Sequence, residues 1–243
     1  MEQADEEGFF AALIPGKTKF PYEYVAEYED GSQKRMKDPY NFPPQITESD
    51  MDKFAAGIHY TVYEKLGAHP MQIDGVDGVS FAVWAPNAVR VSTVGDFNGW
   101  DGRMHQMRRL GDSGIFEIFI PDVKPGDNYK YEIKARGGLT FLKAEPYAFG
   151  QQLRPDTASI VRQAAADCSV AWEDAAWIAD RKERQGKDKP ISIYELYLGS
   201  FRQAEAGGYM NYRELAPLVA DNVKEMGYTH IELMPVMEHP FDA

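Results

Sequence analysis

The sequence has little cysteine, a deficit of positive charge and no long apolar run. Its one cysteine, Cys168, excludes an internal disulfide framework and a multi-cysteine zinc site, and favours a reducing compartment. The formal net charge of -12 argues against a nucleic-acid partner, which needs clustered Lys and Arg. No apolar run approaches the roughly 20 residues that span a bilayer, and the acidic start "MEQADEEG" is unlike a secretory signal. We therefore expect a soluble, cytoplasmic protein without a membrane or nucleic-acid partner.

What the chain does contain is one segment twice. The stretch from Gly8 to Phe42 is repeated, with one insertion, from Gly114 to Phe149. Alternating apolar residues and Pro, Gly and Asp turns predict an antiparallel β-sandwich meander in both copies. Only the second copy is preceded by further strand patterns, in residues 78–86 and 88–100. The first copy is therefore predicted to be a partial module, with an open core face and unpaired edge strands. The matched positions are Gly8/Gly114, Ile14/Ile120, Pro15/Pro121, Tyr22/Tyr129, Tyr24/Tyr131, Pro39/Pro146, Tyr40/Tyr147 and Phe42/Phe149.

Toward the C-terminus the pattern changes to strand, helix, strand. "PISIYELYLGSF" predicts a buried strand, and "MNYRELAPLVADNVKEMG" predicts a helix with Asn211 as N-cap and Gly227 just past its end. "THIELMPV" predicts a second buried strand. This order predicts parallel strands whose functional site lies at their carboxyl ends. Two strands and one helix cannot complete such a sheet, so we expect this domain to be incomplete as well.

The same residues resemble known families. "GVSFAVWAPNAVRVSTVGDFNGWD", continuing to "NYKYEI", resembles a family 48 carbohydrate-binding module. "LGAHP", "PISIYELYLGSF" and "HIELMPVMEHPFD" resemble bacterial-type 1,4-α-glucan (glycogen) branching enzymes of glycoside hydrolase family 13. The resemblance implies a mainly β chain, in which an immunoglobulin-like β-sandwich module follows a partial copy of a similar module and precedes the first β-α-β of a (β/α)8 barrel. The implied domains are a partial β module and connector (1–58), the sandwich (59–163), a linker (164–190) and the truncated start of the catalytic barrel (191–243).

The resemblance also implies a reaction. A retaining glucanotransferase uses an Asp nucleophile and a Glu acid/base to cleave an α-1,4 link, and a 6-hydroxyl of another glucan then accepts the segment as an α-1,6 branch. The implied partners are α-1,4-glucans, namely glycogen and amylose-like chains. The catalytic carboxylates belong to later barrel strands, so we expect an N-terminal fragment that is inactive alone, with no catalytic residue, cofactor or metal. The alternatives are a non-catalytic glucan-binding or adaptor module, and a fragment of a related trehalohydrolase or debranching enzyme.

Three residues are candidates for carbohydrate binding: Trp84, Lys130 and Trp100. An aromatic ring stacks on the apolar face of glucose while polar neighbours bind its hydroxyls. The resemblance implies a Trp at the position of Trp84 and a Lys at that of Lys130. The family's second tryptophan is missing from "GGLTF", which offers Leu139 or Phe141, and its late asparagine is missing from "RPDTASI". Domain packing is the preferred alternative for Trp84, and a turn role is preferred for Trp100.

Other ionisable residues are expected to have structural roles. Glu238 and His239 follow the last strand, but one Glu and one His make no closed ligand set, so loop architecture is preferred over acid/base chemistry or metal binding. Glu195 and Glu232 are expected to be polar side chains inside the barrel. The remaining candidates, interpreted as structural for want of partners at ligand spacing, are His59, His69 and His105.

Overall fold

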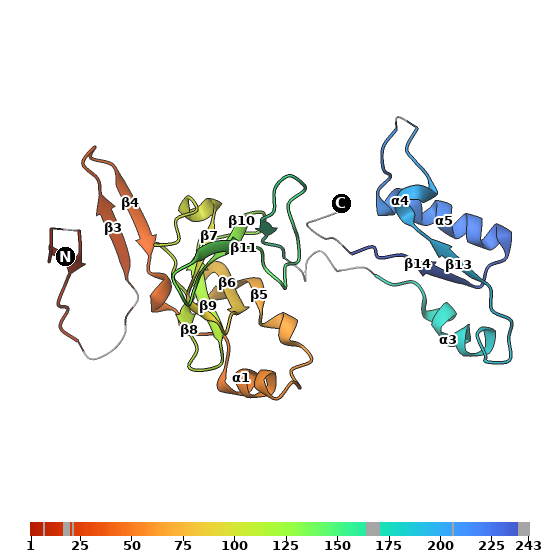
Figure 1. Ribbon diagram of the computed structural model, residues 1–243, viewed down its shortest axis with the longest axis horizontal. Helices are drawn as coiled ribbons and strands as arrows, with labels where there is room; N and C mark the ends of the chain where they lie inside the picture. The colour runs from red at the N-terminus through yellow and green to blue at the C-terminus, as the bar shows by residue number, and fades with distance from the viewer. Residues whose placement is uncertain (7, 17–19, 21, 164–170, 206, 238–243) are drawn as a thin grey trace. The chain divides into compact units, whose positions relative to one another are not determined.

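The computed structural model describes residues 1–6, 8–16, 20, 22–163, 171–205 and 207–237. The chain divides into two compact units, one of Met1–Phe149 with Ala158–Arg162 and one of Gly150–Thr157 with Gln163–Ala243 (Figure 1). The first unit is built mainly of β-strands, and the second contains the long helices α3 and α5.

Two antiparallel sheets form the predicted β-sandwich of the first unit. One sheet has the strand order β5 (Gly67–Ile73), β6 (Val76–Trp84), β9 (Ile115–Pro121), β8 (Arg108–Arg109). In the other sheet, β10 (Asn128–Ala135) pairs with β7 (Ala88–Gly95) along one edge and with β11 (Thr140–Lys143) and β12 (Ser159–Ile160) along the other. The mainly β fold class and the sandwich are thus confirmed.

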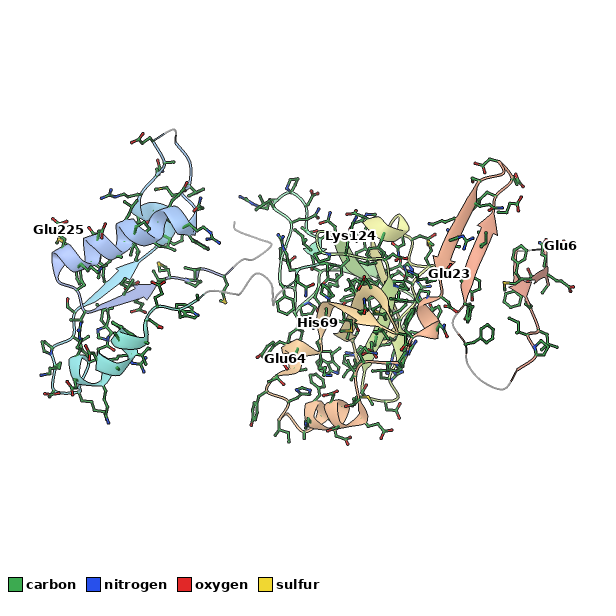
Figure 2. All side chains as sticks on the ribbon, turned by 180° about the vertical axis from the view of Figure 1, so that it is seen from behind. Glu6, Glu23, Glu64, His69, Lys124 and Glu225 are labelled. Carbon is green, nitrogen blue, oxygen red and sulfur yellow. The ribbon has the colours of Figure 1, made fainter. Side chains whose placement is uncertain are left out.

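The core lies between the two sheets, where alternate residues of each strand meet. Val79, Phe81 and Val83 point inward from β6, and Tyr129 and Tyr131 point inward from β10. This spacing is the period of two that places every second side chain of a strand on one face. Burial of each large apolar side chain stabilises the fold by about 1.5–3 kcal/mol. Figure 2 shows side chains crowded in this sandwich and standing apart along the N-terminal hairpin.

The segment that precedes the sandwich covers the outer face of the first sheet. Helix α1 (Glu48–Ala55) begins at the capping box of Thr47 and Asp50, and η2 (Val62–Glu64) follows it. The apolar residues that this segment packs against the sheet form a second cluster, consisting of Ile46, Leu66, Ala82, Leu110 and Ile115 with Met51, Phe54, Val62 and Tyr147. Residues on both sides of position 58 share this cluster, and the predicted domain division at 58 stays a prediction.

The first copy of the repeat forms short strands with exposed apolar side chains. β1 (Glu2–Gln3) pairs with β2 (Phe10–Ala11), and β3 (Glu23–Glu27) pairs with β4 (Gln33–Lys37) in a hairpin that leads into η1 (Pro39–Asn41). By the sequence repeat, β3 and β4 correspond to β10 and β11. Phe10, Ile14 and Val25 are more than half exposed. Phe42, at the end of this copy, is by contrast buried against Phe119, and the partial module stays a prediction.

The second unit contains the predicted β-α-β order. β13 (Ile193–Leu196) and β14 (His230–Leu233) are parallel, and α5 (Tyr212–Met226) connects them after the short α4 (Leu198–Phe201). Asn211 caps α5 by accepting a hydrogen bond from Glu214 N, and Gly227 ends it at a φ of 77°, which L residues rarely adopt. Helix α3 (Ala175–Arg184) precedes β13 in the same unit. The start of a (β/α)8 barrel stays a prediction. Of the described helices, none is long and apolar enough to cross a membrane.

Candidate functional site

Trp84 and Lys130 lie on opposite outer faces of the sandwich. Trp84 alternates with the inward Val83, is 51% exposed, and places its ring edge-to-face against Phe54 of α1, with 5.7 Å between centroids. Lys130 lies between the inward Tyr129 and Tyr131, so it points outward from the other sheet. A single sugar ring cannot contact both side chains, so the structure does not bring this candidate pair together.

Trp100 belongs to a turn that is fixed to the same sheet as Lys130. The buried Asn98 holds this turn: its Oδ1 accepts from Gly95 N at 2.9 Å and its Nδ2 donates to Thr93 O at 2.9 Å. Trp100 follows in a left-handed conformation with φ 63°, is 39% exposed, and donates from Nε1 to Asp96 Oδ1 at 3.2 Å.

The segment after Trp100 crosses the outer face of β10. Asp96 accepts a hydrogen bond from the side chain of Asn128, the first residue of β10, at 2.8 Å. A Cβ added at Gly102 would lie 2.3 Å from Glu132 Oε1, so glycine permits this close approach. Glu132 alternates with Tyr131 and therefore faces outward with Lys130. Trp100 and Lys130 thus lie on the same outer side of this sheet, where β7 is covered, because its outward residues Ser92 and Val94 are 0% exposed.

That outer face also carries charge and apolar contact area. Arg90 on β7 forms an ion pair with Glu132 across the two strands. Leu142 on β11 lies opposite Glu132 and is about half exposed, whereas Phe141 lies opposite the inward Ile133. Leu142, which sequence reasoning did not consider, therefore supplies an apolar side chain on this face, and Phe141 does not.

A buried carboxylate ties the end of the sandwich to its core. The Tyr131 hydroxyl donates to Glu145, whose other carboxylate oxygen accepts from Tyr147 N at 3.0 Å. Ser159 Oγ accepts from Glu145 N at 3.0 Å. Burial raises the pKa of Glu145 to about 7, although both hydrogen bonds to its carboxylate act in the opposite direction. The contact is a structural tie, since Glu145 is only 3% exposed.

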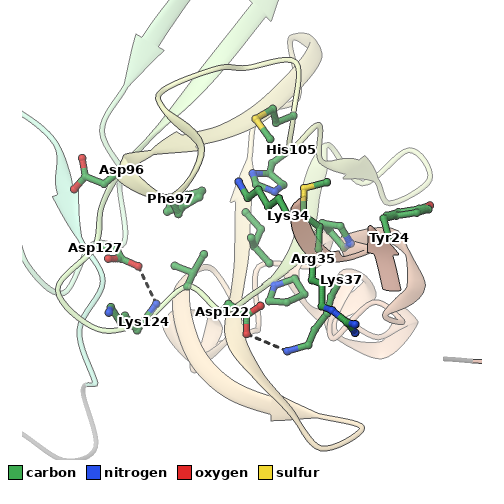
Figure 3. A pocket seen from close by; sticks show the side chains of 16 residues that line it. Tyr24, Lys34, Arg35, Lys37, Asp96, Phe97, His105, Asp122, Lys124 and Asp127 are labelled. Carbon is green, nitrogen blue, oxygen red and sulfur yellow. Dashed lines mark hydrogen bonds and ion pairs between the residues drawn. The ribbon is translucent and has the colours of Figure 1, made fainter. Parts of the chain in front are cut away.

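Two hollows lie between the N-terminal hairpin and the sandwich. The larger has a volume of about 510 Å³, and its lining includes Lys34, Phe97, His105 and Lys124 (Figure 3). The smaller has a volume of about 380 Å³ and is lined by Tyr22, Asp38 and neighbouring residues. No sequence pattern predicts the larger hollow, because its lining comes from three segments that are distant in the chain. Among the described residues no cluster of three or more His, Cys, Asp or Glu could hold a metal ion.

The C-terminal candidates are described only in part. Glu195 and Glu232 face each other in register on β13 and β14, on the sheet face opposite to the one that α5 covers through Leu196. Both carboxylates are exposed. Glu238, His239 and Cys168 lie outside the described residues.

Known proteins are similar to the sandwich and to nearly the whole chain. Residues 65–148 match the family described as carbohydrate-binding module 48 (isoamylase N-terminal domain). The chain is 51% identical over 227 residues to the 1,4-alpha-glucan branching enzyme GlgB of Cellvibrio japonicus (strain Ueda107), covering 92% of this chain and 30% of that protein. It is 49% identical over 242 residues to the enzyme of the same name from Methylococcus capsulatus (strain ATCC 33009 / NCIMB 11132 / Bath), covering 95% and 32%.

The chain is therefore similar to 1,4-alpha-glucan branching enzymes over nearly its whole length, and it spans about a third of the length of the curated relatives it matches. A crystal structure of the GBS pullulanase SAP in complex with maltotetraose is similar in fold, with a TM-score of 0.52 and 20% identity over 72% of this chain and 24% of that one. At this identity the likeness describes the fold alone.

Proposed function

We propose that this chain is the N-terminal part of an enzyme that cleaves α-1,4-glucan links and transfers the released segment to a 6-hydroxyl, which forms α-1,6 branches. The observation that carries the proposal is the identity of about one half to branching enzymes over nearly the whole chain. The substrates are glycogen and amylose-like α-1,4-glucans, and the compartment is the cytoplasm.

The reaction in this proposal is a retaining double displacement. A carboxylate attacks the anomeric carbon and the α-1,4 oxygen leaves with a proton from an acid; the 6-hydroxyl then gives its proton to the same group as it replaces the carboxylate. In a barrel enzyme these groups lie at the carboxyl ends of several strands. The described part of this chain has only the parallel pair β13 and β14. We therefore assign no catalytic residue, and the 243-residue chain is expected to be inactive alone.

The sandwich in this proposal holds glucan on the outer face of β10 and β11, beside the segment that follows Trp100. Trp100 offers a partly exposed ring at one border of this face, and Lys130 and Glu132 supply groups for sugar hydroxyls. Trp84 instead packs on α1 through Phe54, on the other side of the sandwich. Trp100 and Lys130 are thus proposed as the glucan-contacting pair, and Trp84 as a packing residue.

Two measurements test this proposal. The purified chain is expected to leave the iodine absorbance of amylose unchanged, because its described part has only two parallel strands, β13 and β14, and the reacting carboxylates lie at the ends of other strands. Branching by this polypeptide alone would contradict the proposal. Trp100→Ala is expected to weaken maltoheptaose binding at least about tenfold, the loss of roughly 1.4 kcal/mol of ring contact. Trp84→Ala is the matched control and is expected to keep the affinity. The reverse order of the two variants would place the glucan on the α1 side.

A non-catalytic glucan-binding protein is the second candidate. It is favoured by the sandwich, which has a closed core of its own in residues 67–161. It does not account for the parallel strands β13 and β14, whose side chains have no use in a binding module. The other alternative, a trehalohydrolase or debranching enzyme, is favoured by the fold-level likeness to the pullulanase and by the family match of residues 65–148, which is described as an isoamylase N-terminal domain.

A further inference from the structure

The larger hollow has the character of a small-molecule site. It lies between the β3–β4 hairpin and one end of the sandwich, and its volume of about 510 Å³ falls in the range of ligand pockets (Figure 3). Much of its wall is apolar and consists of Met36, Phe97, Met104, Ile120 and Val123. An apolar wall with a few polar groups is the usual design of such pockets.

His105 presents a defined hydrogen-bond donor to this hollow. Asn98 Oδ1 accepts from Gly95 N, so the amide nitrogen of Asn98 is the donor in its 2.8 Å contact with His105 Nδ1. Nδ1 is then the acceptor, and the proton of the neutral ring is on Nε2. Burial, followed by the nearby charge of Lys34, lowers the pKa of His105 to about 4, so the ring is neutral at pH 7. The described residues supply no partner for Nε2.

The hollow also contains cations without counter-ions. Four basic and three acidic side chains line it: Lys34, Arg35, Lys37, Lys124, Asp96, Asp122 and Asp127. Each acid already has a donor, which is Lys37 Nζ for Asp122 at 3.0 Å, Lys124 N for Asp127 at 3.0 Å and the Asn128 amide for Asp96 at 2.8 Å. The ammonium groups of Lys34 and Lys124 have no ion-pair partner among the residues that the structure describes.

We propose that this hollow binds a hexose monophosphate. Lys34, whose side chain lies beside the His105 ring in Figure 3, and the Nε2–H of His105 provide a point charge and a donor for the phosphate oxygens. The ring of Phe97 provides an apolar surface for the sugar. A phosphate alone would leave most of the 510 Å³ unfilled, which favours a sugar ester. The phosphate contacts use neither Trp100 nor Lys130, the proposed glucan-contacting pair, although Asp96 in the lining accepts from Trp100 Nε1.

Calorimetric titration of the 243-residue chain with glucose 6-phosphate tests this site. We expect saturable binding that inorganic phosphate reproduces more weakly and glucose does not reproduce. Lys34→Gln is expected to weaken binding at least about tenfold, and Lys34→Arg is expected to restore most of it, since the charge is kept. Lys53→Gln, at an exposed lysine of α1, is the matched control and is expected to bind like the unchanged chain.

A second readout distinguishes a ligand contact from a structural effect of the substitution. The bound phosphate stabilises the imidazolium form, so the NMR titration of the His105 ring is expected to move to higher pH when glucose 6-phosphate is present. Three results would overturn the proposal: glucose binding as tightly as its phosphate, Lys34→Gln binding without loss, or no saturable binding up to about 10 mM.

Discussion

The two copies of the repeated segment make the same contact in two different environments. In the second copy Glu145 accepts from the Tyr131 hydroxyl and from Tyr147 N. In the first copy Asp38 accepts from the hydroxyl of Tyr24, the counterpart of Tyr131, at 3.1 Å.

The second acceptor contact also has its counterpart. Asp38 accepts from the backbone N of Tyr40, which matches Tyr147, at 2.9 Å. Asp38 and Glu145 themselves occupy matched positions, one residue before a matched proline. The acid and the tyrosine pattern thus belong to the module, independently of whether a second sheet covers them.

Burial is what differs between the copies. Tyr131 is 0% exposed between two sheets, whereas its counterpart Tyr24 is only partly buried, and Tyr22, which also donates to Asp38, is 37% exposed. Both acids are buried, with Asp38 8% and Glu145 3% exposed, so the copies differ in the burial of the tyrosine donors, which water can reach only in the first copy. The comparison teaches that burial of the tyrosine in the sandwich, and not the hydrogen bond alone, sets how much the acid–tyrosine contact contributes to the free energy of unfolding.

Removing the tyrosine ring is expected to give the largest difference in stability between the two copies. Tyr131→Ala is expected to lower the free energy of unfolding of the sandwich by about 3–5 kcal/mol, because it leaves a cavity in a closed core. Tyr24→Ala, the matched change in the first copy, is expected to cost about 1 kcal/mol, since its ring is only partly buried. Urea unfolding followed by near-UV circular dichroism measures both. Equal losses would mean that the hairpin is as well packed as the sandwich.

The pH dependence of stability provides the next test. The folded-state pKa of Glu145 is raised from 4.5 to about 7, so the folded chain holds a proton that the unfolded chain releases between these values. The stabilisation is fully present below pH 4.5 and is lost as the pH rises through 7, with a total of about 3 kcal/mol. Glu145→Gln should remove this component.

The difference between the unchanged chain and Glu145→Gln is the quantity to measure. His105, with a pKa lowered to about 4, acts in the opposite direction, because its stabilisation is lost as the pH falls from 6.5 toward 4. Both chains contain His105, so the difference in unfolding free energy between pH 4.5 and 8 reports Glu145. A difference that does not change with pH would show that Glu145 is not buried in solution.

Deleting single polar groups should give the smallest effects. Tyr131→Phe is expected to cost about 1–3 kcal/mol, because it leaves the buried Glu145 without its donor. Asp38→Asn is expected to cost less than about 1 kcal/mol, since Tyr22, one of the two hydroxyl donors to Asp38, is 37% exposed and can bond to water instead. Chemical unfolding of the two variants side by side decides the order. An Asp38→Asn loss as large as that of Tyr131→Phe would remove the distinction between the copies.

Much of the fold followed from local patterns. The tyrosine alternation in residues 128–133 predicted an inward-facing strand, and the Asn211 cap and Gly227 predicted the ends of α5 to the residue. These features depend on neighbours in sequence, so one chain was enough to predict them.

The site was less predictable, because it depends on which strands pair. Trp84 and Lys130 were considered together from resemblance, but their faces are set by the assignment of β6 and β10 to different sheets. The Asp38 and Glu145 contacts were not predicted, since the two acids differ in type and only their neighbours repeat visibly. The hollow at His105 needed the hairpin to meet the sandwich, which no local pattern encodes.

The register of the parallel strands has a consequence for association. Glu195 and Glu232 stand side by side in the middle of β13 and β14, each of which is an edge strand in the described part of the chain. Another molecule that added a strand in register would bring further carboxylates against these two, and like charges in direct opposition are destabilising. We therefore expect the carboxylate pair to oppose the addition of a strand at either edge, most strongly at neutral pH and low salt.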